Sequence, residues 1–145
     1  MIGILEIIKI IVLGEFLLIE GYRDLRQRNI SMMAVWIVGV LGAILQFEGI
    51  KENGIEIAGG MIIGALILLL AKLTDEKIGY GDGWVLMISG LYLGFRYNMY
   101  LLLISLMLAS FISIILLLTK KADKKTELPF VSFMLPGYLL LLAIM

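Results

Sequence analysis

The sequence lacks cysteine and histidine entirely. Without cysteine it has no disulfide bond, no thiol nucleophile and no thiolate metal ligand. Without histidine it cannot build a serine–histidine pair, an H-E-x-x-H zinc site or a usual haem ligand. Any chemistry must therefore come from carboxylates, lysine, tyrosine or serine, and we expect no metal and no cofactor.

An excess of charge of either sign is missing too, because 12 lysines and arginines balance 12 acidic residues. A chain without a net basic field is not expected to bind nucleic acid. Apolar residues dominate: they make up 61% of the 145 residues, and the mean hydropathy is +1.05. Soluble domains have about 45–50% apolar residues. The composition therefore predicts an integral membrane protein whose surroundings are a lipid bilayer.

A membrane-spanning helix needs about 20 mostly apolar residues. Short polar breaks divide the chain into six apolar runs, at residues 1–21, 31–47, 55–73, 83–95, 98–119 and 128–145. We therefore predict an all-α fold, a polytopic integral membrane protein with six transmembrane helices in one domain, residues 1–145. Nothing in the sequence indicates the oligomeric state.

Basic residues are distributed unevenly between the breaks. Nine of them lie in the breaks after the first, third and fifth runs or at the last turn before such a break: Arg23, Arg26, Arg28, Lys72, Lys77, Lys120, Lys121, Lys124 and Lys125. The other breaks hold Lys51 and Arg96. By the positive-inside rule, the three basic breaks face the cytoplasm and both termini face outward.

Two acids lie where a polar break meets an apolar run. Asp24 is in a basic break that we predict to be a loop before the second run, and Asp82 opens the fourth run. Gly79 and Gly81, beside Asp82, predict a turn with positive φ and close packing. A carboxylate at the edge of the hydrocarbon is energetically costly and so indicates function. We expect the second and fourth runs to pack together so that the two acids meet.

The fourth run is unusually short. Its 13 residues, 83–95, make a helix of about 20 Å, less than the hydrocarbon thickness of about 30 Å. We therefore expect the glycine-rich turn before it to dip below the membrane surface, where protein or a water-filled cavity must surround it.

Two carboxylates that share one proton can hydrolyse a peptide bond, because one activates water while the other protonates the leaving amine. Asp24 and Asp82 are the candidates for this pair. Two plainer interpretations stay open: Asp24 as a solvated acid beside arginines, and Asp82 as a helix N-cap. Tyr80 and Lys77 are candidates for substrate contact or for tuning the pair, with a structural role as the alternative.

The remaining polar and small residues receive structural interpretations. Glu6 and Lys9 have the i, i+3 spacing of a helical ion pair, and Glu20 lies one turn before Asp24. Glu15 lies deeper in the first run, where it fits packing or the lining of a cavity, with proton transfer as the alternative. Glycines at helix-packing spacing predict close helix contacts: Gly60, Gly64, Gly90 and Gly94. Four acids are interpreted as solvated loop residues: Asp75, Glu76, Asp123 and Glu127.

Three motifs resemble those of the type IV prepilin peptidases, a group of intramembrane aspartyl proteases. Residues 79–82 read Gly-Tyr-Gly-Asp, similar to the G-x-G-D signature, and residues 24–30 resemble the first-aspartate motif, an acid followed by basic residues and Ile30. Residues 128–130, Leu-Pro-Phe, resemble the closing Ile-Pro-Phe element. The motifs occur in the family's order over nearly the whole chain.

The resemblance implies that Asp24 and Asp82 form the catalytic dyad of an aspartic endopeptidase. It implies a prepilin-like membrane protein as substrate, whose short leader is cut at the cytoplasmic membrane face. The chain departs from the family at Ser31, where proline is frequent, and at Trp84, where lysine is frequent. The cysteine-rich, zinc-binding part of larger members is absent, so neither zinc nor methyl transfer is implied.

Two alternatives come from other functional classes. A small proton- or cation-coupled transporter or channel would also place acids in the membrane, and it would be favoured if Glu15 proved as sensitive to substitution as Asp82. A non-catalytic component of pilus or secretion assembly would bind pilin-like proteins without cleaving them.

Overall fold

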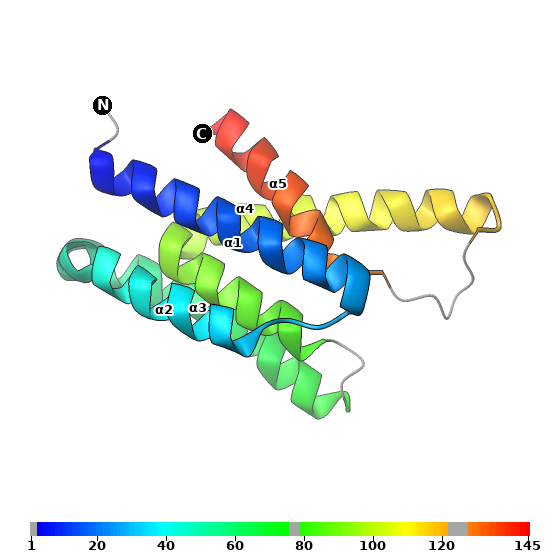
Figure 1. Cartoon of the computed structure of the whole chain (residues 1–145), viewed down its shortest axis with the longest axis horizontal. Coiled ribbons are helices and arrows are strands. Elements are labelled where there is room, and N and C mark those ends of the chain that lie inside the picture. Colours follow the sequence, from blue (N-terminus) through cyan, green and yellow to red (C-terminus); the bar gives the residue numbers. More distant parts are fainter. Residues whose placement is uncertain (1–2, 76–78, 122–127) are drawn as a thin grey trace.

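The computed structural model describes residues 3–75, 79–121 and 128–145. Within these ranges the chain forms five α-helices and no strand: α1 (Ile4–Gln27), α2 (Met32–Leu45), α3 (Phe47–Leu73), α4 (Tyr80–Leu118) and α5 (Phe130–Ile144). Figure 1 shows the helices gathered in one bundle, with the start of α1 and the end of α5 at the same end of it. The prediction of an all-α fold is confirmed.

The chain reverses direction inside α4, at Gly94. This residue has φ 77° and ψ 179°, a conformation that glycine adopts without a steric penalty. The Asn98 side chain donates to Leu86 O at 3.1 Å, although 12 residues of continuous helix would span about 18 Å. Thus α4 has a first arm, residues 80–93, and a second arm, residues 95–118, which turns back from it (Figure 1). Six predicted runs therefore give five helices, since the runs 83–95 and 98–119 are the two arms of α4.

Glycines bring α3 and α4 into close contact. A Cβ on Gly60 would lie 2.5 Å from the carbonyl oxygen of Gly90, so neither position has room for a side chain. The Asn98 side chain donates to Gly60 O at 3.0 Å and accepts from the Ser89 hydroxyl at 2.6 Å, which pairs these buried polar groups. The predicted helix contact through Gly60 and Gly90 is confirmed.

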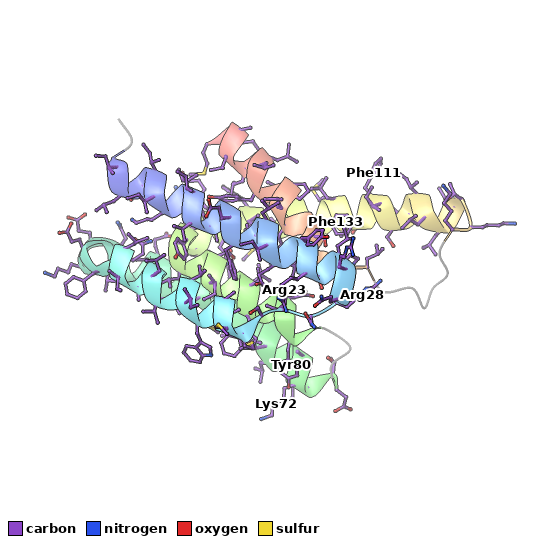
Figure 2. The ribbon with its side chains drawn as sticks, in the orientation of Figure 1. Arg23, Arg28, Lys72, Tyr80, Phe111 and Phe133 are labelled. Carbon is purple, nitrogen blue, oxygen red and sulfur yellow. The ribbon has the colours of Figure 1, made fainter. Side chains whose placement is uncertain are left out.

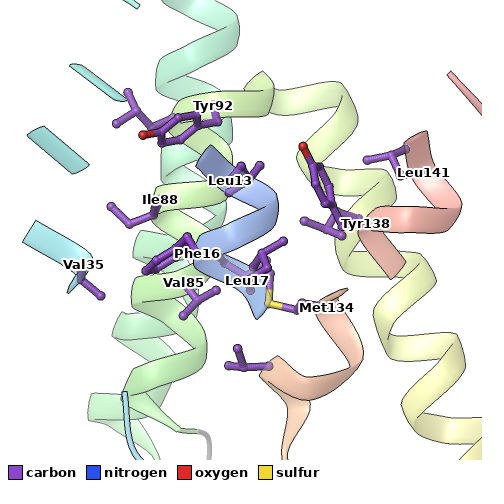
Figure 3. Close-up of a cluster of buried hydrophobic side chains, with 14 of the residues drawn as sticks. Leu13, Phe16, Leu17, Val35, Val85, Ile88, Tyr92, Met134, Tyr138 and Leu141 are labelled. Carbon is purple, nitrogen blue, oxygen red and sulfur yellow. The ribbon is translucent and has the colours of Figure 1, made fainter. Parts of the chain in front are cut away.

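The core lies where α1, α2, α4 and α5 meet. Figure 3 shows this cluster, to which all four helices contribute: Leu13, Phe16, Leu17, Val35, Val85, Ile88, Tyr92, Met134, Tyr138 and Leu141. The Tyr138 hydroxyl donates to Ile10 O at 3.0 Å, so a hydrogen bond joins α5 to α1 beside the apolar contacts. These contacts fix α1, α4 and α5 relative to one another.

Large apolar side chains also cover the outside of the bundle. Ile55 is 91% exposed, Ile4 79% and Leu118 77%. Apolar surface of this extent is not typical of a soluble monomer and indicates contact with lipid or protein. Two helices, α3 and α4, are long and apolar enough to cross a membrane, and α2 and α5 are shorter apolar helices.

Candidate active site

Asp24 lies on a helix. The polar residues after Gly21 continue α1 to Gln27, and Arg28 ends it with a left-handed φ of 55° and an N–H that donates to Asp24 O at 3.1 Å. The prediction of a loop here was wrong, because residues 22–27 contain no proline or glycine and include several good helix formers. Asp24 is only 8% exposed, so it is not a solvated surface acid.

The N-terminus of α5 holds the Asp24 carboxylate. Val131 N–H donates to Asp24 Oδ2 at 3.0 Å, and the Ser132 hydroxyl donates to Gly21 O at 2.8 Å. The first N–H groups of a helix have no partner within that helix, and its dipole favours an anion at this end. This contact is not predicted from the sequence. Its signal is Pro129, which stands at the N-cap of α5, since proline at a helix start marks the free N–H groups that follow.

Burial dominates the electrostatics of Asp24. It raises the pKa of the Asp24 carboxyl, while the Val131 N–H and then the positive charge of Arg28 act in the opposite direction. Asp24 lies beyond the apolar part of α1, in the polar stretch 22–28. The N–H donors therefore position a carboxylate whose loss of hydration the surrounding donors and charges do not fully compensate.

Asp82 is the third residue of α4. The N-cap of this helix is Gly79, with φ −68° and ψ 135°, so Asp82 is not the N-cap. The predicted positive-φ turn is wrong, because among the described glycines positive φ occurs at Gly94. Gly81 instead provides space, because a Cβ there would lie 2.5 Å from Ile30 Cγ1, whereas a Cβ on Gly79 would make an ordinary contact with Asp82 Oδ2 at 3.5 Å.

The two acids lie within electrostatic range of each other. Asp82 is half-buried, and the negative charge of Asp24 acts on it. Within the described residues, no hydrogen bond to the Asp82 carboxyl group is present. The acids come from α1 and α4 rather than from the second and fourth runs, because Asp24 belongs to the end of α1.

Basic and aromatic residues surround this end of the bundle. Figure 2 places Arg23, Arg28, Lys72 and Tyr80 there, away from the chain ends. Tyr80 is 38% exposed and lies two residues before Asp82, so it can meet a ligand that approaches the acids. Lys77, the other predicted contact residue, lies outside the described residues. No group of three or more metal-ligating side chains occurs in the part of the chain that the structure describes.

A cavity of about 610 Å³ lies at the opposite end of the bundle. Its charged lining residues are Glu6, Lys9, Glu52, Glu56 and Arg96, and the predicted pair of Glu6 and Lys9 is confirmed at 2.7 Å. Neither Asp24 nor Asp82 lines it. Glu15 is exposed and does not line it either, so the predicted role of Glu15 in lining a cavity is not seen there.

One comparison with known proteins gives a match. A model of the type IV leader peptidase family matches residues 11–118, a range that contains Asp24, Asp82 and the contact between α3 and α4. No curated protein matches the chain, and no solved structure does. Because the match covers well over half of the 145 residues, the chain belongs to the type IV leader peptidase family.

Proposed function

We propose that this protein is a membrane-embedded aspartic endopeptidase that removes the leader peptide of prepilin-like precursors, with Asp24 and Asp82 as its catalytic dyad. The observation that carries the proposal is that the charge of Asp24 acts on Asp82, although these acids are 58 positions apart in the sequence and come from different helices. A shared proton between two carboxylates is the arrangement that this hydrolysis requires.

The hydrogen bonds suggest different roles for the two acids. Val131 N–H stabilises the ionised form of Asp24, so Asp24 is the general base that takes a proton from water as its oxygen attacks the scissile carbonyl carbon. Asp82 is the general acid, and its proton passes to the amide nitrogen as the C–N bond breaks. Transfer of the new proton from Asp24 to Asp82 restores the starting state.

The unequal arms of α4 support a site below the membrane surface. From Gly94, the first arm reaches Tyr80 over about 20 Å, and the second arm reaches Leu118 over about 36 Å. Figure 2 shows the second arm, with Phe111, extending past the rest of the bundle. If the second arm spans the hydrocarbon, Asp82 lies on the order of 10 Å inside it, where the apolar helix of a prepilin-like substrate begins.

The basic residues support a cytoplasmic orientation of the site. Arg23, Arg28 and Lys72 lie at the end of the bundle that holds the acids (Figure 2). The positive-inside rule assigns this end to the cytoplasm. A leader peptide that has not crossed the membrane would meet the dyad from that side.

Cleavage of a co-expressed prepilin-like precursor tests the proposal. Asp24→Asn and Asp82→Asn should each abolish processing while the protein remains inserted in the membrane. Asp75→Asn is the matched control, because Asp75 is an exposed acid with φ 52°, a conformation that asparagine tolerates. Normal processing by either dyad variant would remove that residue from the mechanism.

Transport is the alternative function, and the charged cavity at the other end of the bundle is the observation in its favour. Along α1 the cavity lining ends at Leu13, about 16 Å before Asp24. Phe16 and Leu17, both buried, occupy the interval. Ion flux in vesicles by the wild-type protein, together with no cleavage of a prepilin-like precursor, would support transport and contradict the peptidase.

A further inference from the structure

The cavity of about 610 Å³ at the end of the bundle opposite the dyad has a charged mouth and an apolar floor. Glu52 and Arg96 are exposed and form the mouth, whereas Leu13 and Tyr138 form the floor and are 0% and 1% exposed. From Glu6 to Leu13, α1 lines the cavity over about 10 Å. Pockets for small molecules measure about 300–1,000 Å³ and combine apolar walls with a few polar groups. This cavity therefore has the size and the lining of a ligand site.

Two interruptions of regular helix line this cavity. Asn53, with φ −126° and ψ 27°, interrupts α3, and Gly94 is the reversal of α4. In a membrane, backbone that departs from a helix is tolerated only where it is buried in protein or lines a polar cavity. Glu56 meets part of this need, because its Oε2 accepts from Arg96 N–H at 3.4 Å at the start of the second arm. Glu56 is thereby committed to the protein rather than to a ligand.

One positive and one negative side chain of the lining remain after the internal pairs are counted. Lys9 pairs with Glu6 at 2.7 Å, and Glu56 accepts from the backbone. Within residues 3–75, 79–121 and 128–145, neither the Arg96 guanidinium nor the Glu52 carboxylate takes part in an ion pair or a hydrogen bond. The mouth therefore presents two separate charges of opposite sign, which suits a ligand that carries both an anionic and a cationic group.

Gln46 contributes a fixed acceptor to the wall of the cavity. It is 7% exposed, and its amide nitrogen donates to Leu91 O at 3.0 Å and to Tyr92 O at 3.3 Å. These two bonds use both N–H groups of the amide and so hold the side chain in one orientation. Its Oε1 accepts no hydrogen bond from any residue that the structure describes. A donor on a ligand would pair this oxygen, as buried polar atoms require.

The surroundings of the mouth fit the level of phospholipid head groups. Tyr97 lines the cavity and makes an edge-to-face contact with Tyr100, with ring centroids 6.4 Å apart, and tyrosine is enriched where a membrane meets water. Ile4 and Ile11, on the part of α1 that lines the cavity, are 79% and 52% exposed, as expected of side chains in contact with hydrocarbon. The positive-inside rule places this end of the bundle away from the cytoplasm. A lipid of that leaflet would reach the cavity directly.

We propose that this cavity binds the head group of a phospholipid with a primary ammonium group, from the leaflet that faces away from the cytoplasm. The inference rests on the membrane orientation in the proposed function and not on catalysis. Arg96 binds the phosphate, because a guanidinium group matches phosphate oxygens with two parallel hydrogen bonds. Glu52 and Gln46 Oε1 accept from the ammonium group, and the first carbons of the acyl chains lie against the apolar floor.

Lipid binding by the purified full-length protein tests the proposal. The protein in detergent is titrated with phosphatidylethanolamine, phosphatidylcholine or phosphatidylglycerol, and native mass spectrometry counts the bound lipids. One phosphatidylethanolamine should bind at least about tenfold more tightly than either other lipid, because choline has no N–H donor and glycerol has no charge. Glycerophosphoethanolamine, the soluble head group, should bind more weakly, since it has no acyl chains for the floor. Equal affinities for the three lipids, or for the lipid and its soluble head group, would overturn the proposal.

Each end of the head group has its own variant and matched control. Arg96→Gln should weaken binding of phosphatidylethanolamine and phosphatidylcholine alike by at least about tenfold, and Glu52→Gln should lower the affinity for phosphatidylethanolamine to that for phosphatidylcholine. The controls are Lys51→Gln and Glu48→Gln, because both residues are exposed and lie outside the cavity lining. Unchanged binding in either cavity variant, or an equal loss in its control, would overturn the proposal. Should one cavity variant fail to fold, the other still tests its own end of the head group.

Asp82→Asn separates this inference from the proposed function. Asp82 does not line the cavity, so this variant should bind phosphatidylethanolamine as the wild-type protein does, although we expect it to cleave no precursor. Selective lipid binding that depends on Arg96 and Glu52 supports the inference even if the wild-type protein cleaves nothing. An active peptidase without selective lipid binding would overturn the inference and leave the proposed function in place.

Discussion

The Asp24 carboxylate accepts a hydrogen bond from Val131 N–H at 3.0 Å, across 107 residues of sequence. The same contact includes the Ser132 hydroxyl, which donates to Gly21 O at 2.8 Å. The start of α5 therefore fixes the end of α1, and with it one of the two proposed catalytic acids. Activity should depend on this docking as well as on the acids themselves.

A substitution that separates α5 from α1 should reduce cleavage while the protein stays inserted. A Cβ on Gly21 would already be in van der Waals contact with Val131 O at 3.4 Å, so we expect the two further methyl groups in Gly21→Val to push α5 away. Loss of a hydrogen bond to a charged group amounts to about 1.5–3 kcal/mol, so we expect kcat to fall at least about tenfold. Gly3→Val is the control, because nothing lies within 4 Å of a Cβ at Gly3. Cleavage by Gly21→Val at the wild-type rate would show that activity does not depend on the contact between α5 and α1.

The positive charge of Arg28 acts on Asp24, so its removal should change the pH dependence of cleavage. Because burial raises the pKa of Asp24, the general base is protonated over a range above the ordinary value of about 3.9, and the rate falls as pH drops through that range. Arg28 opposes this rise in pKa, so Arg28→Gln should move the acidic limb to higher pH. Initial cleavage rates in vesicles between pH 4 and pH 8 measure the limb. A shift to lower pH would contradict the assignment of Asp24 as the base.

The contact between α3 and α4 should tolerate no side chain at its centre. In Gly60→Val the new side chain meets the Gly90 carbonyl, since even a Cβ would lie 2.5 Å from it. Overpacking of this kind destabilises by about 1–3 kcal/mol, and we expect a lower Tm in detergent and less folded protein. Gly54→Val is the control, because its nearest neighbour is a flexible side-chain atom of Ile50 at 3.9 Å. Equal Tm values for the two variants would be inconsistent with the close contact at Gly60.

The sequence pattern predicts the helices better than the way they meet. Apolar runs mark where the chain is helical, and the motif around Gly79 indicates Asp82. The sequence predicts a break between the runs 83–95 and 98–119, and the structure turns the chain close to it with one positive-φ glycine, Gly94, instead of a polar loop. The Glu20 and Asp24 contacts depend on Ser31 and Val131 backbone donors. Pro129 marks the start of α5 and so its free N–H groups, but no sequence pattern names the acid that they bind.

Crosslinking tests the meeting of the two acids most directly, because the chain contains no cysteine of its own. The double variant Asp24→Cys/Asp82→Cys carries one thiol at each position of the dyad, and Asp24→Cys/Asp75→Cys is the matched control. With a short thiol-to-thiol crosslinker in native membranes, the first pair should form an intramolecular crosslink and the control should not. No crosslink between positions 24 and 82, or equal crosslinking in the control, would contradict a dyad formed by α1 and α4.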